Sequence, residues 1–168
     1  MSTPVSPDWL KEQTLASMNE LRHRGPDDSG VWVDPDAGLA LGHRRLSVID
    51  LSSQGRQPMV SANERYVIAF NGEIYNFRKL RAELQAEGAK FRGHSDTEVL
   101  LEAIVRCSLI TTLKRVNGML AMALWDRQER TLHLARDRFG QKPLYYGWAD
   151  GTFVFGSELS ALRKFPTF

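Results

Sequence analysis

The spacing of apolar and polar positions changes several times along the chain, and each change predicts a different element. Near the N-terminus, apolar residues recur at roughly helical spacing from Leu10 to Leu21. Ser6 precedes them as a candidate N-cap, followed by a proline and an acid in the first turn. We therefore expect a helix that ends near Arg24, because a Gly-Pro pair follows.

Shorter apolar runs have the composition and alternation of β-strands. The run from Tyr66 to Phe70 lacks a polar face, so it predicts a buried strand, which should stop at Asn71-Gly72. Asp150-Gly151 is a dipeptide favoured in hairpin turns. The other predicted strands are Val31 to Val33, Leu39 to Ile49, Val116 to Trp125, Thr131 to Ala135, Tyr145 to Tyr146 and Phe153 to Phe155.

Three further helices are predicted from caps and helical spacing. Asn76 should cap a helix whose apolar face contains Leu80 and Leu84 and which Gly88 ends. Ser95-Asp96-Thr97-Glu98 has the form of a capping box, so a helix should begin there and run to about Cys107. A short last helix is expected near 157–165.

The order of these elements indicates a fold class. Strands are mostly followed by strands, and helices come in sequential pairs, which is typical of α+β folds with antiparallel sheets. The 168 residues, 42% of them hydrophobic and 25% charged, match an average globular protein. We therefore predict a single α+β domain over residues 1–168.

Charge and cysteine content narrow the class of partner. Lys plus Arg is 22 and Asp plus Glu is 20, which gives a net charge of +2 and indicates no polyanionic partner such as nucleic acid. One cysteine, no signal peptide and no long apolar run predict a cytoplasmic protein that does not span a membrane.

Familiar catalytic motifs are missing, including phosphate-binding loops, nucleophile elbows and zinc-binding cysteine pairs. What remains are polar residues at the ends of predicted strands and helices, where a rigid fold can direct them. They lie in four segments: Arg22 to Asp27, Arg45 to Asp50, Asn71 to Asn76 and Ser95 to Glu98.

These segments have the chemistry of a site for a small zwitterion. A guanidinium such as that of Arg45 can bind a carboxylate through two parallel hydrogen bonds, and the carboxylate of Asp96 can bind an ammonium. The Asn71 side chain followed by the Gly72 N–H offers two donors side by side, which is what a tetrahedral oxyanion requires. The pattern therefore predicts a site for a free amino acid, with hydrolysis of a side-chain amide as the candidate reaction.

Plainer interpretations exist for each residue taken alone. An acid such as Asp96 is favoured in the first turn of any helix. The basic residues around His23 and Arg44 could be solvated loops or phosphate contacts. His94 and Asp96 have no further ligand at a suitable spacing, so no metal is expected.

In order and spacing, the four segments resemble the class II glutamine amidotransferase domain of glutamine-hydrolysing asparagine synthetases. NGEIYN at 71–76 and RLSVID at 45–50 are the discriminating strings, and the resemblance covers about residues 15–165. It implies an N-terminal-nucleophile hydrolase fold, a four-layer α-β-β-α sandwich of antiparallel sheets. It also implies residue roles: Arg45 for the glutamine carboxylate, Asp96 for its ammonium, Asn71 and Gly72 for the oxyanion, and Glu73 with the backbone of Leu46, Ser47, Val48 and Ile49 lining the pocket.

The chain departs from this family at its start. Family members begin with a cysteine whose thiolate attacks glutamine and whose α-amine acts as base. This sequence begins Met1-Ser2-Thr3-Pro4, without the strand that would carry the cysteine, and Ser2 is too close to the first helix to replace it. Cys107 is expected to be a small buried residue on the apolar stripe of its helix. We therefore expect negligible glutamine hydrolysis, with a misplaced start codon and a degenerate remnant both open as explanations.

The resemblance also sets expectations about partners and cofactors. Glutamine is the expected ligand, and this domain needs no cofactor. ATP and magnesium belong to the synthetase domain, which this chain lacks and which could be a partner, as could a second copy of the chain. The alternative functions are a non-catalytic glutamine- or partner-binding module and, ranked last, a nucleic-acid-binding domain.

Overall fold

The computed structural model describes residues 6–46, 55–166 and 168. Its helices are α1 (Pro7–Glu20), α2 (Phe77–Ala86), α3 (Asp96–Cys107), α4 (Leu109–Arg115) and α5 (Leu159–Leu162). Its strands are β1 (Asp28–Asp34), β2 (Leu39–Arg45), β3 (Met59–Val60), β4 (Tyr66–Ile74), β5 (Gly118–Asp126), β6 (Thr131–Arg136), β7 (Tyr145–Ala149) and β8 (Thr152–Gly156).

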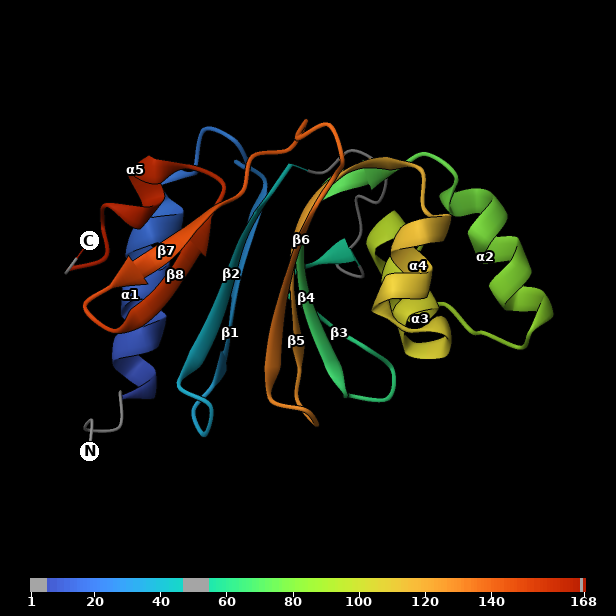
Figure 1. Ribbon diagram of the computed structural model, residues 1–168, viewed down its shortest axis with the longest axis horizontal. Coiled ribbons are helices and arrows are strands. Elements are labelled where there is room, and N and C mark those ends of the chain that lie inside the picture. The colour runs from blue at the N-terminus through green and yellow to red at the C-terminus, as the bar shows by residue number, and fades with distance from the viewer. Residues whose placement is uncertain (1–5, 47–54, 167) are drawn as a thin grey trace.

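The described strands pair only in antiparallel fashion. β3, β4, β5 and β6 form a four-stranded sheet in that order, and β1–β2 and β7–β8 are separate hairpins. Figure 1 shows α1 and α5 outside the two hairpins, the four-stranded sheet facing the hairpins, and α2, α3 and α4 on the far side of that sheet. The prediction of a mixed α+β fold with antiparallel sheets is confirmed.

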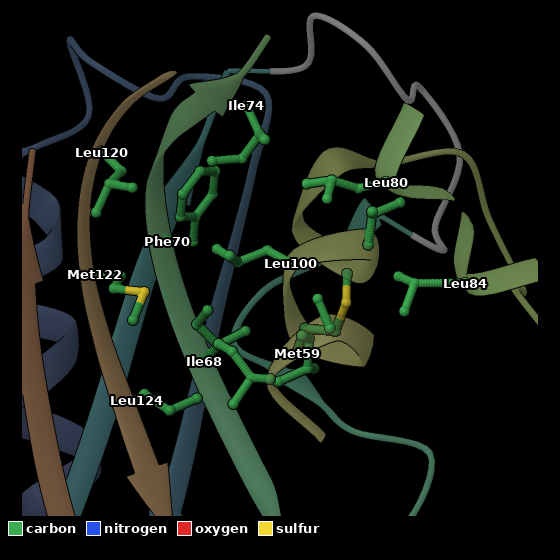
Figure 2. Packing of buried hydrophobic residues seen from close by; sticks show 14 of the residues in the cluster. Met59, Ile68, Phe70, Ile74, Leu80, Leu84, Leu100, Leu120, Met122 and Leu124 are labelled. Carbon is green, nitrogen blue, oxygen red and sulfur yellow. The ribbon is translucent and has the colours of Figure 1, made fainter. Parts of the chain in front are cut away.

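Strand β4 is buried on both faces, which explains its continuous apolar sequence. Ile68, Phe70 and Ile74 pack with Leu100 of α3 in the larger core cluster (Figure 2). Val67 belongs to a second cluster between this sheet and the β1–β2 hairpin. Because side chains alternate across a strand, one run of apolar residues supplies both cores.

The predicted end of β4 at Asn71-Gly72 is wrong. The strand continues to Ile74, with Asn71 opposite Ala121 and Gly72 opposite Leu120 of β5. A Cβ on Gly72 would lie 2.3 Å from the Met119 carbonyl oxygen. Close contact with β5, not a turn, therefore accounts for the glycine, and the nine-residue pairing overrides the local turn preference.

Of the two predicted helix caps, one is absent and the other is formed only in part. Asn76 makes no capping bond at α2; its side chain donates to the Arg115 carbonyl at 3.0 Å and accepts from the Asn117 N–H at 2.9 Å. Ser95 does cap α3 by accepting from the Glu98 N–H. The Glu98 carboxylate, however, accepts from the N–H groups at 92 and 93, so it anchors the preceding loop instead of completing the capping box.

Other boundaries differ from expectation by a few residues. Helix α1 begins as predicted after Ser6 but ends at Glu20, with turns over 21–24. Helix α4 was not predicted, and α5 is shorter than expected. The β7–β8 turn is confirmed, with positive φ at Asp150 and Gly151.

Candidate functional site

A hollow of about 560 Å³ lies where β2, β4 and the start of α3 meet. Strand β2 contributes Gly42 to Arg45, strand β4 contributes Phe70 to Glu73, and the start of α3 contributes Ser95 to Thr97. Its volume is within the range of small-molecule sites. Three elements far apart in the sequence thus build one wall around a space large enough for an amino acid.

The predicted site residues that the structure describes all line this hollow. They are Arg45, Leu46, Asn71, Gly72, Glu73 and Asp96. Ser47, Val48 and Ile49 lie outside the described residues. The structure therefore brings these residues together at one hollow, although they come from separate elements.

The edge of β4 that points away from β5 has a row of main-chain amides near the hollow. The Tyr75 N–H donates to the Asn117 carbonyl, and the Arg127 N–H donates to the Arg65 carbonyl. The main-chain N–H and carbonyl groups of the odd-numbered residues of β4 therefore point towards β5. The N–H groups of Phe70, Gly72 and Ile74 therefore point to the opposite edge.

Two of these three amides have side-chain acceptors. The Phe70 N–H donates to Gln57 Oε1 at 2.6 Å, and the Ile74 N–H donates to Asp96 Oδ2 at 2.9 Å. The Gly72 N–H lies between them in the lining of the hollow. Asn71 and Gly72 are thus neighbouring residues of the lining.

Asp96 belongs both to the fold and to the hollow. It is the first residue of α3, is only 6% exposed, and uses Oδ2 to accept from Ile74. Burial raises the pKa of its carboxyl group, the hydrogen bonds from Ile74 and Thr97 oppose that rise, and the nearby charge of Glu73 adds to it. A cation bound here would relieve the carboxylate of an unfavourable environment.

His43 also lines the hollow, and we did not predict it. Its Nε2 lies 3.0 Å from the Phe70 carbonyl oxygen, which can only accept, so Nε2 carries the proton. Nδ1 is then a bare acceptor; it is buried and has no hydrogen-bond partner among the residues that the structure describes. Burial lowers the pKa of His43 to about 4, so the imidazole is neutral near pH 7. No periodicity or spacing in the sequence distinguishes this histidine from its neighbours.

The basic segments next to the hollow have structural partners. Arg24 donates to Glu158 Oε1 at 3.0 Å, and His23 lies 3.1 Å from the same oxygen. Arg44 Nε donates to the Gly25 carbonyl at 2.8 Å. These bonds join the loop after α1 to β2 and to the segment before α5, so both basic segments help to build the fold.

A loop held by one aspartate brings Lys142 to the hollow. Asp137 accepts hydrogen bonds from the main-chain N–H groups of Lys142, Gln141, Leu120 and Phe139. These bonds hold the pKa of Asp137 below its usual value. The loop conformation therefore depends on an ionised carboxylate, and Lys142 adds a cation to the lining.

Cys107 lies away from the hollow and is not buried as expected. It is partly exposed at the C-terminal end of α3, and Arg115 Nη1 lies 3.3 Å from its sulfur. Asp96 is at the other end of that helix, about 16 Å along the axis. The lining of the hollow contains no cysteine among the described residues.

Two kinds of feature are absent from the described part of the chain. No helix there is long and apolar enough to cross a membrane. No group of three or more histidine, cysteine, aspartate or glutamate residues there is arranged to hold a metal ion.

Similarity to known proteins agrees with this geometry. The glutamine amidotransferase domain family matches residues 4–168. The chain is 42% identical over 159 residues to asparagine synthetase (glutamine-hydrolyzing) 3 of Bacillus subtilis, covering 93% of this chain and 25% of that protein. It is 34% identical over 154 residues to amidase chry2 of Gibberella zeae, covering 92% of this chain and 23% of that protein.

A solved structure shares the fold. Glutamine phosphoribosylpyrophosphate amidotransferase of Bacillus subtilis superposes with a TM-score of 0.78 at 23% identity, covering 90% of this chain and 40% of that one. The chain spans about a quarter of the length of the asparagine synthetases of Bacillus subtilis that it matches. Matched over nearly its whole length, the chain belongs to the glutamine amidotransferase domain family, as a class II domain akin to the N-terminal domain of asparagine synthetases.

Proposed function

We propose that the hollow binds L-glutamine and that the chain is the glutaminase domain of an asparagine synthetase-like amidotransferase. One observation supports this most strongly: Arg45, the Asn71-Gly72 pair and Asp96 come from three elements and line one hollow. Arg45 would bind the α-carboxylate and Asp96 the α-ammonium. Asn71 and Gly72 would donate to the side-chain carbonyl oxygen, and more strongly to the oxyanion of a tetrahedral intermediate.

The proposal includes the wider setting of the domain. We infer that the layer order seen in Figure 1 is the α-β-β-α order of N-terminal-nucleophile hydrolases. The ammonia acceptor, aspartate or a related acid, would be amidated by a synthetase unit that uses ATP and magnesium. The domain itself would act on glutamine without a cofactor.

The polypeptide of residues 1–168 should bind glutamine without hydrolysing it. Its one cysteine, Cys107, lies outside the hollow, and the intact pair of oxyanion donors cannot replace an attacking thiolate. Taken alone, this polypeptide would therefore behave as a glutamine-binding module.

Titration calorimetry on this polypeptide, with an ammonia assay run in parallel, tests the proposal. L-Glutamine should give saturable heat, D-glutamine should give none, and ammonia should stay at the blank level. Arg45→Met should abolish the heat, whereas Arg138→Met, on an exposed loop, should leave it unchanged. Absence of heat with folded polypeptide would overturn glutamine binding, and ammonia release would overturn the predicted lack of hydrolysis.

A further inference from the structure

We propose that Gln57 is a positioning residue for the oxyanion donors, an inference that rests on the proposed glutamine site. Its side-chain carboxamide takes the place of a neighbouring strand beside Phe70. By fixing Phe70, it fixes the direction of the two groups that follow, the Asn71 side chain and the Gly72 N–H.

The register of β3 places Gln57 beside Phe70. Met59 pairs with Ile68, so if β3 extended two residues towards the N-terminus, the partner of Phe70 would be Gln57. β3 begins only at Met59, and the main chain of Gln57 is not part of the ladder. Without another partner, the N–H and the carbonyl of Phe70 would be unpaired on this edge of β4, immediately before the oxyanion donors.

The Gln57 side chain supplies that support with the bonds of a peptide group. Its Oε1 accepts from the Phe70 N–H at 2.6 Å, and its Nε2 donates to the Phe70 carbonyl at 3.1 Å. Nε2 also lies 3.4 Å from Thr97 Oγ1, in the first turn of α3 beside Asp96. Gln57 is 8% exposed, so these bonds are shielded from water.

His43, on the facing β1–β2 hairpin, binds the same residue of β4. Its Nε2–H donates to the Phe70 carbonyl, which therefore accepts from two side chains. The carbonyl of Phe70 and the amide nitrogen of Asn71 belong to one peptide unit. Holding that carbonyl from two directions therefore restrains rotation at the residue that carries the first oxyanion donor. Such donors act only when their geometry is held within narrow limits.

The test compares two ligands that differ only at the carbonyl end. L-Norvaline has the same α-groups as L-glutamine and the same three side-chain carbons, but it lacks the oxygen and the nitrogen of the carboxamide. Both are titrated into the 168-residue polypeptide and followed by the amide NMR signals, up to saturation. The variants are Gln57→Met, which has a similar shape without these hydrogen bonds, and Gln85→Met, a matched change on the exposed face of α2.

In Gln57→Met, glutamine affinity should fall at least tenfold, while norvaline affinity changes less than twofold. The shift that saturating glutamine causes at the Gly72 amide should fall by half or more, and hydrogen exchange at the Phe70 amide should accelerate. Gln57→Glu should retain protection at the Phe70 amide, because a carboxylate still accepts there. Equal losses for both ligands, or no loss, would overturn the positioning role alone. Failure of the unmodified polypeptide to bind glutamine would overturn the proposed function, and this inference with it.

Discussion

Asp96 accepts a hydrogen bond from the main-chain N–H of Ile74 over 2.9 Å, so the first residue of α3 is attached directly to the edge of β4. The contact places a buried carboxylate beside the strand that carries the proposed oxyanion donors. It also means that a change at Asp96 can affect both the fold and the ligand, and these two effects can be separated by the choice of substitution.

We expect Asp96→Asn to weaken glutamine binding while leaving the fold intact. The amide oxygen can still accept from Ile74, but the charge that would bind the ammonium is gone. Loss of a charge-assisted hydrogen bond should lower the affinity about 10- to 100-fold, roughly 1.5–3 kcal/mol. Calorimetry measures the affinity and thermal unfolding the stability. Asp96→Ala, the companion variant, should lower both. An Asp96→Asn protein that binds glutamine normally would contradict the assigned role.

The stability of the domain should fall in mild acid because of His43. Burial lowers the pKa of this imidazole from 6.5 to about 4. The free energy of unfolding is therefore not reduced by this group above pH 6.5. As the pH falls towards 4, the free energy of unfolding decreases, because the unfolded state takes up the proton before the folded state does. The loss should reach roughly 3 kcal/mol near pH 4.

Urea unfolding at several pH values measures that loss. His43→Gln removes the titrating group and can still donate to the Phe70 carbonyl, so it should flatten the decline. His133→Gln, on β6, is the matched control and should leave the decline in place. Parallel curves for the unmodified protein and His43→Gln would show that His43 is not the group responsible.

We expect Gly72→Ala to destabilise the domain by about 1–3 kcal/mol. The added Cβ would meet the Met119 carbonyl oxygen at 2.3 Å and Phe70 Cζ at 2.8 Å, inside the β4–β5 pair. Denaturant unfolding gives the free energy. Gly147→Ala on β7, where nothing lies within 4 Å of the new Cβ, should change it by no more than about 0.5 kcal/mol. Equal effects at both positions would contradict the packing argument.

Asp126 should matter for stability and not for glutamine. It is 3% exposed, and Arg65 Nη2 donates to its Oδ2 at 2.7 Å, at the end of β5 farthest from the hollow. Asp126→Asn should lower the free energy of unfolding by about 1–3 kcal/mol. Glutamine affinity measured well below the melting temperature should not change. Asp150→Asn, in the exposed β7–β8 turn, is the neutral control.

The sequence predicted which residues meet at the hollow better than it predicted the local structure that carries them. Asn71-Gly72 has the dipeptide signature of a turn, yet it lies inside β4, because a partner strand more than forty residues later supplies nine consecutive pairs. A pattern of neighbouring residues cannot report a pairing with so distant a segment. The same limit explains Asn76, whose side chain bonds to the last residue of α4 and to Asn117 just after it.

Gln57 and His43 show a second limit of sequence reasoning. Neither has a helical or strand-like spacing that marks it, and both act on the main chain of Phe70. A carbonyl or an N–H is present at nearly every position, so a side chain that binds one leaves no pattern in the residue types. Arg45 and Asp96 were singled out because their charges would match the two ends of an amino acid.

The unbroken β4–β5 pairing makes the wall beside Asn71 and Gly72 part of the central ladder. A strand that is paired along its whole length and covered on both faces opens locally only at a free energy close to that of global unfolding. A ligand of the proposed site would therefore meet a preformed wall on the side formed by β4. Molecules of the wrong length or hydrogen-bonding pattern would be rejected by rigidity, not by a closing motion.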